Sequence, residues 1–198
     1  MPQAIVFDLF GVIALHQSAE DKQRLERLAG APPRTFWESY WALRKPYDAG
    51  QTSVDYWATM GRRLGVNYDA ATVKALIDAD LASWTGVDPT MVDLLGDLSA
   101  AGRKLGLLSN IIEDLVPVFE AKHGSWLSRF HARTYSCQIG VAKPDHDAYR
   151  IAAARLGVEP RDCIFIDDNE NNVRAARETG MQAEVFTSPA QVRRLLAA

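Results

Sequence analysis

Asp8, Asp167 and Asp168 are the residues whose types and spacing most clearly indicate chemistry. Asp8 follows a short apolar run, and the pair Asp167 and Asp168 follows another. Two adjacent carboxylates repel each other unless a cation joins them. Carboxylate oxygens suit a hard divalent cation, and a cation that keeps few protein ligands and binds substrate phosphate is typically magnesium. We therefore expect a divalent ion between Asp8 and Asp167 or Asp168.

Other polar residues follow apolar runs in the same way. Ser109 and Asn110 come after one run, and Lys143 lies in a loop after the next. Singly, Ser109 could cap a helix and Lys143 could be a solvated charge. Together with Asp8 they suit covalent phosphoryl transfer through an aspartyl phosphate: Asp8 attacks, Lys143 holds the negative charge, and Ser109 with nearby backbone N–H groups binds a nonbridging oxygen.

The elements that must position these residues alternate between strand and helix from about residue 87 onward. This alternation predicts an α/β fold, a parallel sheet with helices on both faces, in which ligands bind beyond the carboxyl ends of the strands. The expected strands are Ala4–Phe7, Lys104–Leu108, Arg133–Ser136, Cys163–Ile166 and Ala183–Phe186. The expected helices are Pro89–Ala101, Glu113–His123, Asp145–Leu156, Glu170–Thr179 and a last helix that ends at Leu196.

Residues 17–85 have a different pattern, with helical periodicity and little strand signal. Breaks at Gly30–Pro33, Pro46–Thr52 and Gly65–Asn67 indicate an insertion of about four helices. Its many large aromatic residues are the expected core of a small helical bundle, and some could instead line a ligand pocket. We expect two domains: a core of residues 1–16 and 86–198, and a helical cap of residues 17–85.

The composition of the chain limits the classes of partner that it is expected to bind. The net charge of -3 gives no basic field for nucleic acid or anionic lipid, so a small-molecule substrate is expected. Two cysteines beside apolar runs favour reduced thiols in the cytoplasm. No apolar run approaches the roughly 18 residues of a membrane span. The sequence does not indicate an oligomeric state.

At this point the chain resembles the haloacid dehalogenase (HAD) superfamily of hydrolases, by four motifs in order. These are Phe7–Val12, Leu107–Asn110, Lys143–Asp145, and Phe165–Asp168 followed by Asn172. A small helical cap directly after the first motif is typical of one large subgroup, subfamily IA. The resemblance implies a three-layer Rossmann-like core with a helical-bundle cap.

The resemblance also implies roles for individual residues. Asp8 would be the nucleophile, Lys143 would steady the intermediate, and Ser109 and Asn110 would bind the transferred group. Asp8, Asp167, Asp168 and the backbone carbonyl of Phe10 would bind Mg²⁺. Phe10 to Leu15 would form the squiggle and flap of the superfamily, with Gly11 permitting the tight turn beside the substrate.

Phe10 departs from the family pattern. Family phosphatases usually carry an aspartate there, which protonates the leaving group and later activates water. General acid–base catalysis contributes about 10²- to 10⁴-fold, or roughly 3 to 5 kcal/mol of barrier. The expected function is a magnesium-dependent phosphatase of a small phosphorylated metabolite that lacks this acid, with His16 as the candidate replacement.

Two alternatives remain open. One is a 2-haloacid dehalogenase, and the pairing of Lys143 with Tyr149 is compatible with it. In that case Arg34 or Arg44 could bind the halide. Family dehalogenases, however, need no magnesium and have small neutral residues at the positions of Asp167 and Asp168. The other is a catalytically weak ligand-binding protein. Substrate identity would be set by cap residues, for which the candidates are Trp41, Arg44 and Tyr47.

Overall fold

The computed structural model describes residues 2–197, and its centre is a five-stranded parallel sheet. The strand order is β3-β2-β1-β4-β5. The strands are β1 (Ala4–Phe7), β2 (Lys104–Ser109), β3 (Ala132–Tyr135), β4 (Cys163–Asp167) and β5 (Gln182–Val185). The predicted α/β fold is therefore confirmed, and β1, which carries Asp8 at its end, lies in the middle of the sheet between β2 and β4.

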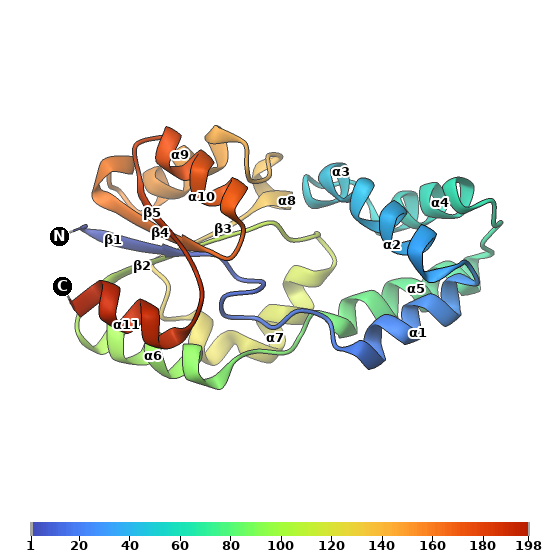
Figure 1. The fold of residues 1–198 in the computed structure, drawn as a ribbon, viewed down its shortest axis with the longest axis horizontal. Coiled ribbons are helices and arrows are strands. Elements are labelled where there is room, and N and C mark those ends of the chain that lie inside the picture. Colours follow the sequence, from blue (N-terminus) through green and yellow to red (C-terminus); the bar gives the residue numbers. More distant parts are fainter. Residues whose placement is uncertain (1, 198) are drawn as a thin grey trace.

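Helices cover both faces of this sheet (Figure 1). Successive side chains of a strand point to opposite faces. Ile5 and Phe7 therefore pack with residues of α6 (Pro89–Ala100), α7 (Leu115–Leu127) and α11 (Pro189–Ala197). Ala4 and Val6 pack instead with residues of α9 (His146–Arg155) and α10 (Glu170–Glu178). Among residues 2–197 no helix has the length and apolar character needed to cross a membrane.

Five helices fall within residues 17–85, and they lie beyond one end of the sheet in Figure 1. They are α1 (Ala19–Ala29), α2 (Pro33–Ala42), α3 (Arg44–Asp48), α4 (Ser53–Leu64) and α5 (Ala70–Ser83). The expectation of about four helices misses the short α3. Pro46, taken as a break, lies in the first turn of α3, where a missing backbone N–H costs no intrahelical bond. We call α1–α5 the cap helices; the division into two domains stays a prediction.

Several elements begin or end one or more residues away from the predicted positions. β3 begins at Ala132 and ends before Ser136, which starts the short helix α8 (Ser136–Ile139). β5 likewise lies one residue earlier than expected. Helix α7 starts two residues later and continues through Gly124 to Leu127. Burial of Trp126 and Leu127 in the core outweighs the low helix propensity of that glycine.

Candidate active site

Asp8, Lys143 and Asp167 form a buried ionic cluster at the carboxyl edge of the sheet. The Lys143 Nζ atom lies 2.6 Å from Asp8 Oδ1 and 2.7 Å from Asp167 Oδ2. Asp8 follows β1, and Asp167 ends the neighbouring β4. Parallel strands end at one edge, and the structure brings these three residues together there.

Burial changes the protonation of this cluster. Loss of solvent raises the pKa of Asp8 to about 8, against the lowering effect of Lys143 and with a further raising effect of Asp167. Burial alone would lower the pKa of Lys143, but Asp167 and Asp8 together raise it above its usual value. The raised pKa of Asp8 reflects the cost of holding two buried carboxylates beside a single ammonium group. A bound divalent cation would offset that cost and favour the ionised form of Asp8.

The adjacent carboxylates Asp167 and Asp168 occupy different environments. Asp167 is fully buried and accepts hydrogen bonds from the Asn169 backbone N–H at 2.8 Å and from the Asn172 amide at 3.1 Å, besides its contact with Lys143. Asp168 has a side chain 31% exposed and lines a cavity. Its pKa is raised by partial burial and by Asp167. Asp168 is therefore the member of the pair that a ligand can reach.

One ligand oxygen from each of Asp8, Asp167 and Asp168 lies within 4.8 Å of the others. Such a cluster of carboxylates fits a hard cation such as magnesium. His16 stands beside it: its Nε2 atom is 3.2 Å from Asp168 Oδ2, and the ring is 62% exposed at the edge of the same cavity. The residues present thus fit the expected metal.

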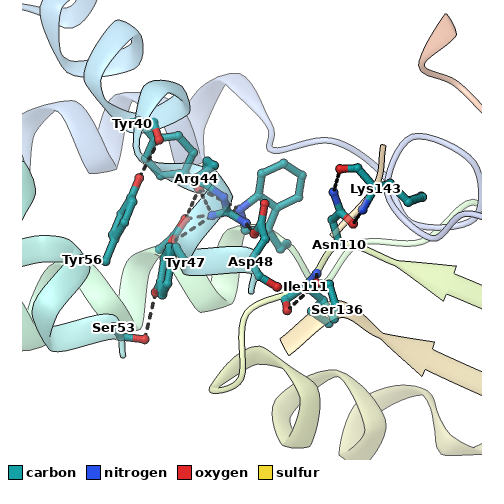
Figure 2. Close-up of polar contacts among 12 residues, drawn as sticks. Tyr40, Arg44, Tyr47, Asp48, Ser53, Tyr56, Asn110, Ile111, Ser136 and Lys143 are labelled. Carbon is teal, nitrogen blue, oxygen red and sulfur yellow. Dashed lines mark hydrogen bonds and ion pairs between the residues drawn. The ribbon is translucent and has the colours of Figure 1, made fainter. Parts of the chain in front are cut away.

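Of the two predicted substrate-binding neighbours Ser109 and Asn110, only Asn110 lies at the cavity. Ser109 is completely buried at the end of β2, and its Oγ atom has no hydrogen-bond partner within the described part of the chain. The Asn110 side chain lines the cavity, but its amide is engaged with the Lys143 backbone in both directions at 2.8 Å (Figure 2). Asn110 therefore fixes the loop that carries Lys143.

Gly11 and Phe10 form the tight turn after Asp8. The Leu9 carbonyl accepts hydrogen bonds from the backbones of Ile13 and Ala14 at 2.9 and 2.7 Å. Gly11 has φ +85°, and a Cβ atom there would lie 2.1 Å from Asp168 Oδ2, so only glycine fits. The Phe10 ring lines the cavity and makes edge contacts with Trp84 and Phe119.

The cavity, of about 190 Å³, lies between the sheet edge and the cap helices. Besides Phe10, Leu115 and the polar residues already described, four cap-side residues line it, which we call the cap wall: Trp41, Arg44, Asp48 and Trp84. Of the predicted substrate residues, Trp41 and Arg44 are thus at the cavity. Tyr47 is buried beside Tyr56 and does not line it.

Arg44 is the charged centre of the cap wall. Its guanidinium donates to Asp48 Oδ1 at 2.7 Å and stacks on the rings of Tyr40 and Tyr47 (Figure 2). The guanidinium also lies 4.0 Å from the carboxylate of the buried Asp80. Arg34, the other predicted halide candidate, has a side chain 90% exposed and pairs with Glu38. Sequence analysis missed Asp48 and Asp80. The i,i+4 spacing of Arg44 and Asp48 was an available signal for the first.

The aromatic residues of the cap helices divide between the two expected roles. Most are buried in the bundle: Phe36, Tyr40, Tyr47, Tyr56 and Trp57. Trp41 is 53% exposed, and its ring makes an edge contact with Trp84 at a centroid distance of 6.2 Å. Trp84 in turn contacts Phe10 at 5.1 Å. One aromatic surface therefore runs from the turn after Asp8 to helix α2.

Ser136 joins the cap helices to the sheet. Its Oγ atom donates to the Asp48 carbonyl at 2.5 Å and accepts from the Ile111 N–H at 2.9 Å (Figure 2). Ser53 of α4 donates to Asp114 just before α7. These contacts hold the cap wall over the strand ends.

The comparisons with known proteins agree with this geometry. A family model described as haloacid dehalogenase-like hydrolase matches residues 2–180. The chain belongs to this family. The identification from four motifs is therefore confirmed, as is the Rossmann-like α/β fold.

The curated proteins that are similar to this chain include a hydrolase and a phosphatase. Flavin mononucleotide hydrolase 1 of Arabidopsis thaliana is 45% identical over 78 residues, which are 39% of this chain and only 28% of that protein. Phosphatase MT3486 of Mycobacterium tuberculosis is 25% identical over 210 residues, 96% of this chain and 89% of that protein. The first relative thus matches over a fraction of its length.

Two solved structures show the same fold. A HAD family enzyme from Bacteroides thetaiotaomicron, in complex with magnesium and inorganic phosphate, has a TM-score of 0.75 at 18% identity and covers 94% of this chain and 95% of its own. L-2-haloacid dehalogenase from Xanthobacter autotrophicus has a TM-score of 0.71 at 21% identity and covers 100% and 84%. At such identities the likeness concerns the fold.

Proposed function

We propose that this hydrolase is a magnesium-dependent phosphatase of a small phosphorylated metabolite, with Asp8 as nucleophile. The observation that carries the proposal is the cluster of Asp8, Asp167 and Asp168, with ligand oxygens within 4.8 Å of one another, beside Lys143. The magnesium and phosphate in the Bacteroides protein and the name of the Mycobacterium phosphatase support it.

Asp8, Asp168 and the Phe10 carbonyl would hold the magnesium ion, with Asp167 close by. Bound there, the ion would neutralise the oxygens of a phosphoryl group. Asp167 accepts hydrogen bonds from Lys143, Asn169 and Asn172, so its first task is to hold Lys143 in place. Asp168 has fewer such contacts and is the more accessible ligand.

Transfer would take place on the Asp8 carboxylate. Asp8 Oδ1 accepts from the Leu9 N–H at 2.6 Å and contacts Lys143, which leaves Oδ2 to attack phosphorus. The bond from phosphorus to the leaving oxygen breaks, and that oxygen takes a proton. Water then hydrolyses the aspartyl phosphate and regenerates Asp8. Lys143 stabilises the negative charge in both steps.

Phe10 can neither donate a proton to the leaving oxygen in the first step nor accept one from the attacking water in the second. A cost of this kind falls mainly on substrates whose leaving oxygen is strongly basic. His16 lines the cavity and is the candidate proton donor that the sequence suggests. We therefore expect faster hydrolysis of activated aryl phosphates than of alkyl phosphates.

Dehalogenation is the competing function, and the carboxylate cluster opposes it. A halide ion leaving near Asp8 would meet Asp167 and Asp168 without a metal to offset their charge. The only cation within 4 Å of Asp8, among the described residues, is Lys143. The fold likeness to the Xanthobacter dehalogenase does not distinguish the two reactions.

The test measures phosphate release from 4-nitrophenyl phosphate by the wild type, Asp8→Asn and Glu38→Gln, with magnesium and with chelator. We expect activity that requires both Asp8 and magnesium, and no change in Glu38→Gln, whose exposed carboxylate lies outside the cavity. Halide release from a 2-haloacid without metal, with no phosphate release, would establish the dehalogenase instead.

We place the protein in the cytoplasm as part of this proposal. Cys137 and Cys163 are both free thiols. Burial raises the pKa of each to about 11, so both stay protonated and unreactive at neutral pH. Unpaired, unreactive thiols suit a reducing compartment.

A further inference from the structure

Two cations line the cavity besides His16, and each is already balanced by two carboxylates. Lys143 contacts Asp8 and Asp167 within 2.7 Å. On the opposite side, Arg44 contacts Asp48 at 2.7 Å and Asp80 at 4.0 Å. Even with one acid of each pair protonated, neither cation has a free positive charge. Apart from His16, which contacts Asp168 at 3.2 Å, the cavity therefore offers no side chain to neutralise a second anionic group of a substrate.

The cap wall presents a carboxylate where the far end of a substrate would lie. Asp48 lines the cavity, and only its Oδ1 atom is bound to Arg44. An ionised carboxylate accepts hydrogen bonds, so it binds a hydroxyl group and repels another carboxylate or phosphate. Arg44, held at both ends, orients Asp48 and cannot turn toward an anion without leaving Asp48 and Asp80 unpaired.

The other two residues of the cap wall, Trp41 and Trp84, are aromatic. Together with Phe10 they form one aromatic surface along the cavity. Such ring faces pack against the C–H groups of a polyol or sugar. The volume of about 190 Å³ is below the roughly 300 to 1,000 Å³ of drug-sized sites, so a small molecule is favoured over a nucleotide.

Resting on the phosphatase function proposed above, we infer that Asp48, positioned by Arg44, selects small phosphate monoesters with a neutral, hydroxyl-bearing body, a polyol or sugar monophosphate. Substrates with a carboxylate or a second phosphate at the far end are excluded by charge. Trp41 and Trp84 bind the apolar face of the selected molecule. The specificity therefore lies in the cap wall, and the transfer chemistry lies at the strand ends.

Matched substrates test this inference by changing a single group. Glycerol 3-phosphate and 3-phosphoglycerate differ only in a CH₂OH or carboxylate at carbon 1, as do sorbitol 6-phosphate and 6-phosphogluconate. The measurement is kcat/KM for each pair in the wild type. We expect the neutral member to be favoured at least about tenfold in one of the two chain lengths. Equal values, or preference for the acid in both pairs, would overturn the inference.

Asp48→Asn keeps the shape of the side chain and removes its charge. It frees part of the Arg44 charge, so the neutral-to-acid ratio of kcat/KM should fall by about tenfold. Glu38→Gln is the matched control, since Arg34 and Glu38 form the same i,i+4 pair on an exposed face. An unchanged ratio in Asp48→Asn, or an equal fall in Glu38→Gln, would contradict the role of Asp48.

Failure of the two proposals can be distinguished. If wild-type protein hydrolyses 4-nitrophenyl phosphate but prefers the acids, only the specificity inference fails. If it hydrolyses no phosphate ester, the phosphatase function fails, and the same matched pairs are compared by calorimetric Kd in the wild type. Tighter binding of the neutral members would then still support the inference, and tighter binding of the acids would refute it.

Discussion

Each of the two ends of the cavity has one buried cation between two carboxylates, but different elements of the fold hold the two clusters in place. At the strand ends, Lys143 lies between Asp8 and Asp167; at the cap wall, Arg44 lies between Asp48 and Asp80. The first cluster is fixed by the loops that follow parallel strands. The second is fixed by packing of helices α2, α3 and α5, where aromatic rings enclose the guanidinium. In the functions proposed above, the sheet positions the residues for phosphoryl transfer, and the cap helices position the residues that select the substrate.

The sharpest way to break this comparison is to remove each cation in turn. Lys143→Met and Arg44→Met should each lower the free energy of unfolding by about 3 to 5 kcal/mol, because each leaves buried carboxylates unpaired. Only Lys143→Met should also abolish hydrolysis of 4-nitrophenyl phosphate, since Arg44 does not touch the transferred group. Urea unfolding and phosphate release measure the two effects. Equal loss of activity in both variants would mean that the two clusters do not have separate roles in catalysis and in substrate selection.

Asp167 and Asp168 allow a comparison within the strand-end cluster. Asp167→Asn should cost about 2 to 3 kcal/mol of stability, because it weakens charged hydrogen bonds to buried partners. Asp168→Asn should cost less than about 0.5 kcal/mol, since its side chain is partly exposed. It should instead raise the magnesium concentration for half-maximal activity by at least about tenfold, the loss expected for even an outer-shell partner.

The controls for this pair are unfolding curves with and without magnesium. Magnesium should raise the melting temperature of the wild type more than that of Asp168→Asn. If the two substitutions have interchanged effects, the assignment of Asp168 as the accessible carboxylate is wrong.

Phe10→Asp restores the general acid that family phosphatases usually carry at this position, beside the aromatic surface of the cavity. A carboxyl group against Trp84 and Phe119 would be desolvated, which raises its pKa and keeps it in the proton-donating form. We expect hydrolysis of an alkyl phosphate to rise about 10- to 100-fold, with a smaller gain for 4-nitrophenyl phosphate. Phe10→Asn, of nearly the same shape, should give no gain. A gain shared equally by both variants would indicate a packing effect.

Ser136→Ala removes the hydroxyl group that links the cap wall to the strand ends. Its loss leaves the Asp48 carbonyl and the Ile111 N–H without this partner, which should cost about 1 to 2 kcal/mol in thermal or urea unfolding. KM should rise with kcat nearly unchanged, because the cap wall is less firmly held. Ser128→Ala, at an exposed serine that directly follows α7, should change neither the stability nor KM by a comparable amount.

Much of the fold and of the strand-end cluster followed from the sequence alone. Alternating strands and helices imply a parallel sheet, and a residue that directly follows a parallel strand lies at the same edge as its counterparts. That reasoning is enough to bring Asp8 and Asp167 together. Lys143 lies in a loop beyond the short helix α8, and only the structure places its Nζ atom between the two carboxylates. The sequence also predicts that Gly11 is needed for the turn, although the 2.1 Å approach to Asp168 is visible only in the structure.

Only the tertiary structure decided which atoms face the cavity. Asp167 and Asp168 are neighbours, yet the hydrogen bonds of Asn169 and Asn172 turn one inward and leave the other accessible. Ser109 was expected at the substrate and is buried. Arg44, Asp48 and Asp80 come together through helix packing, which depends on side-chain shape over distant segments and leaves no local pattern. The sequence determined the reaction chemistry that this protein can support, and the packing of its helices decided what lies opposite it.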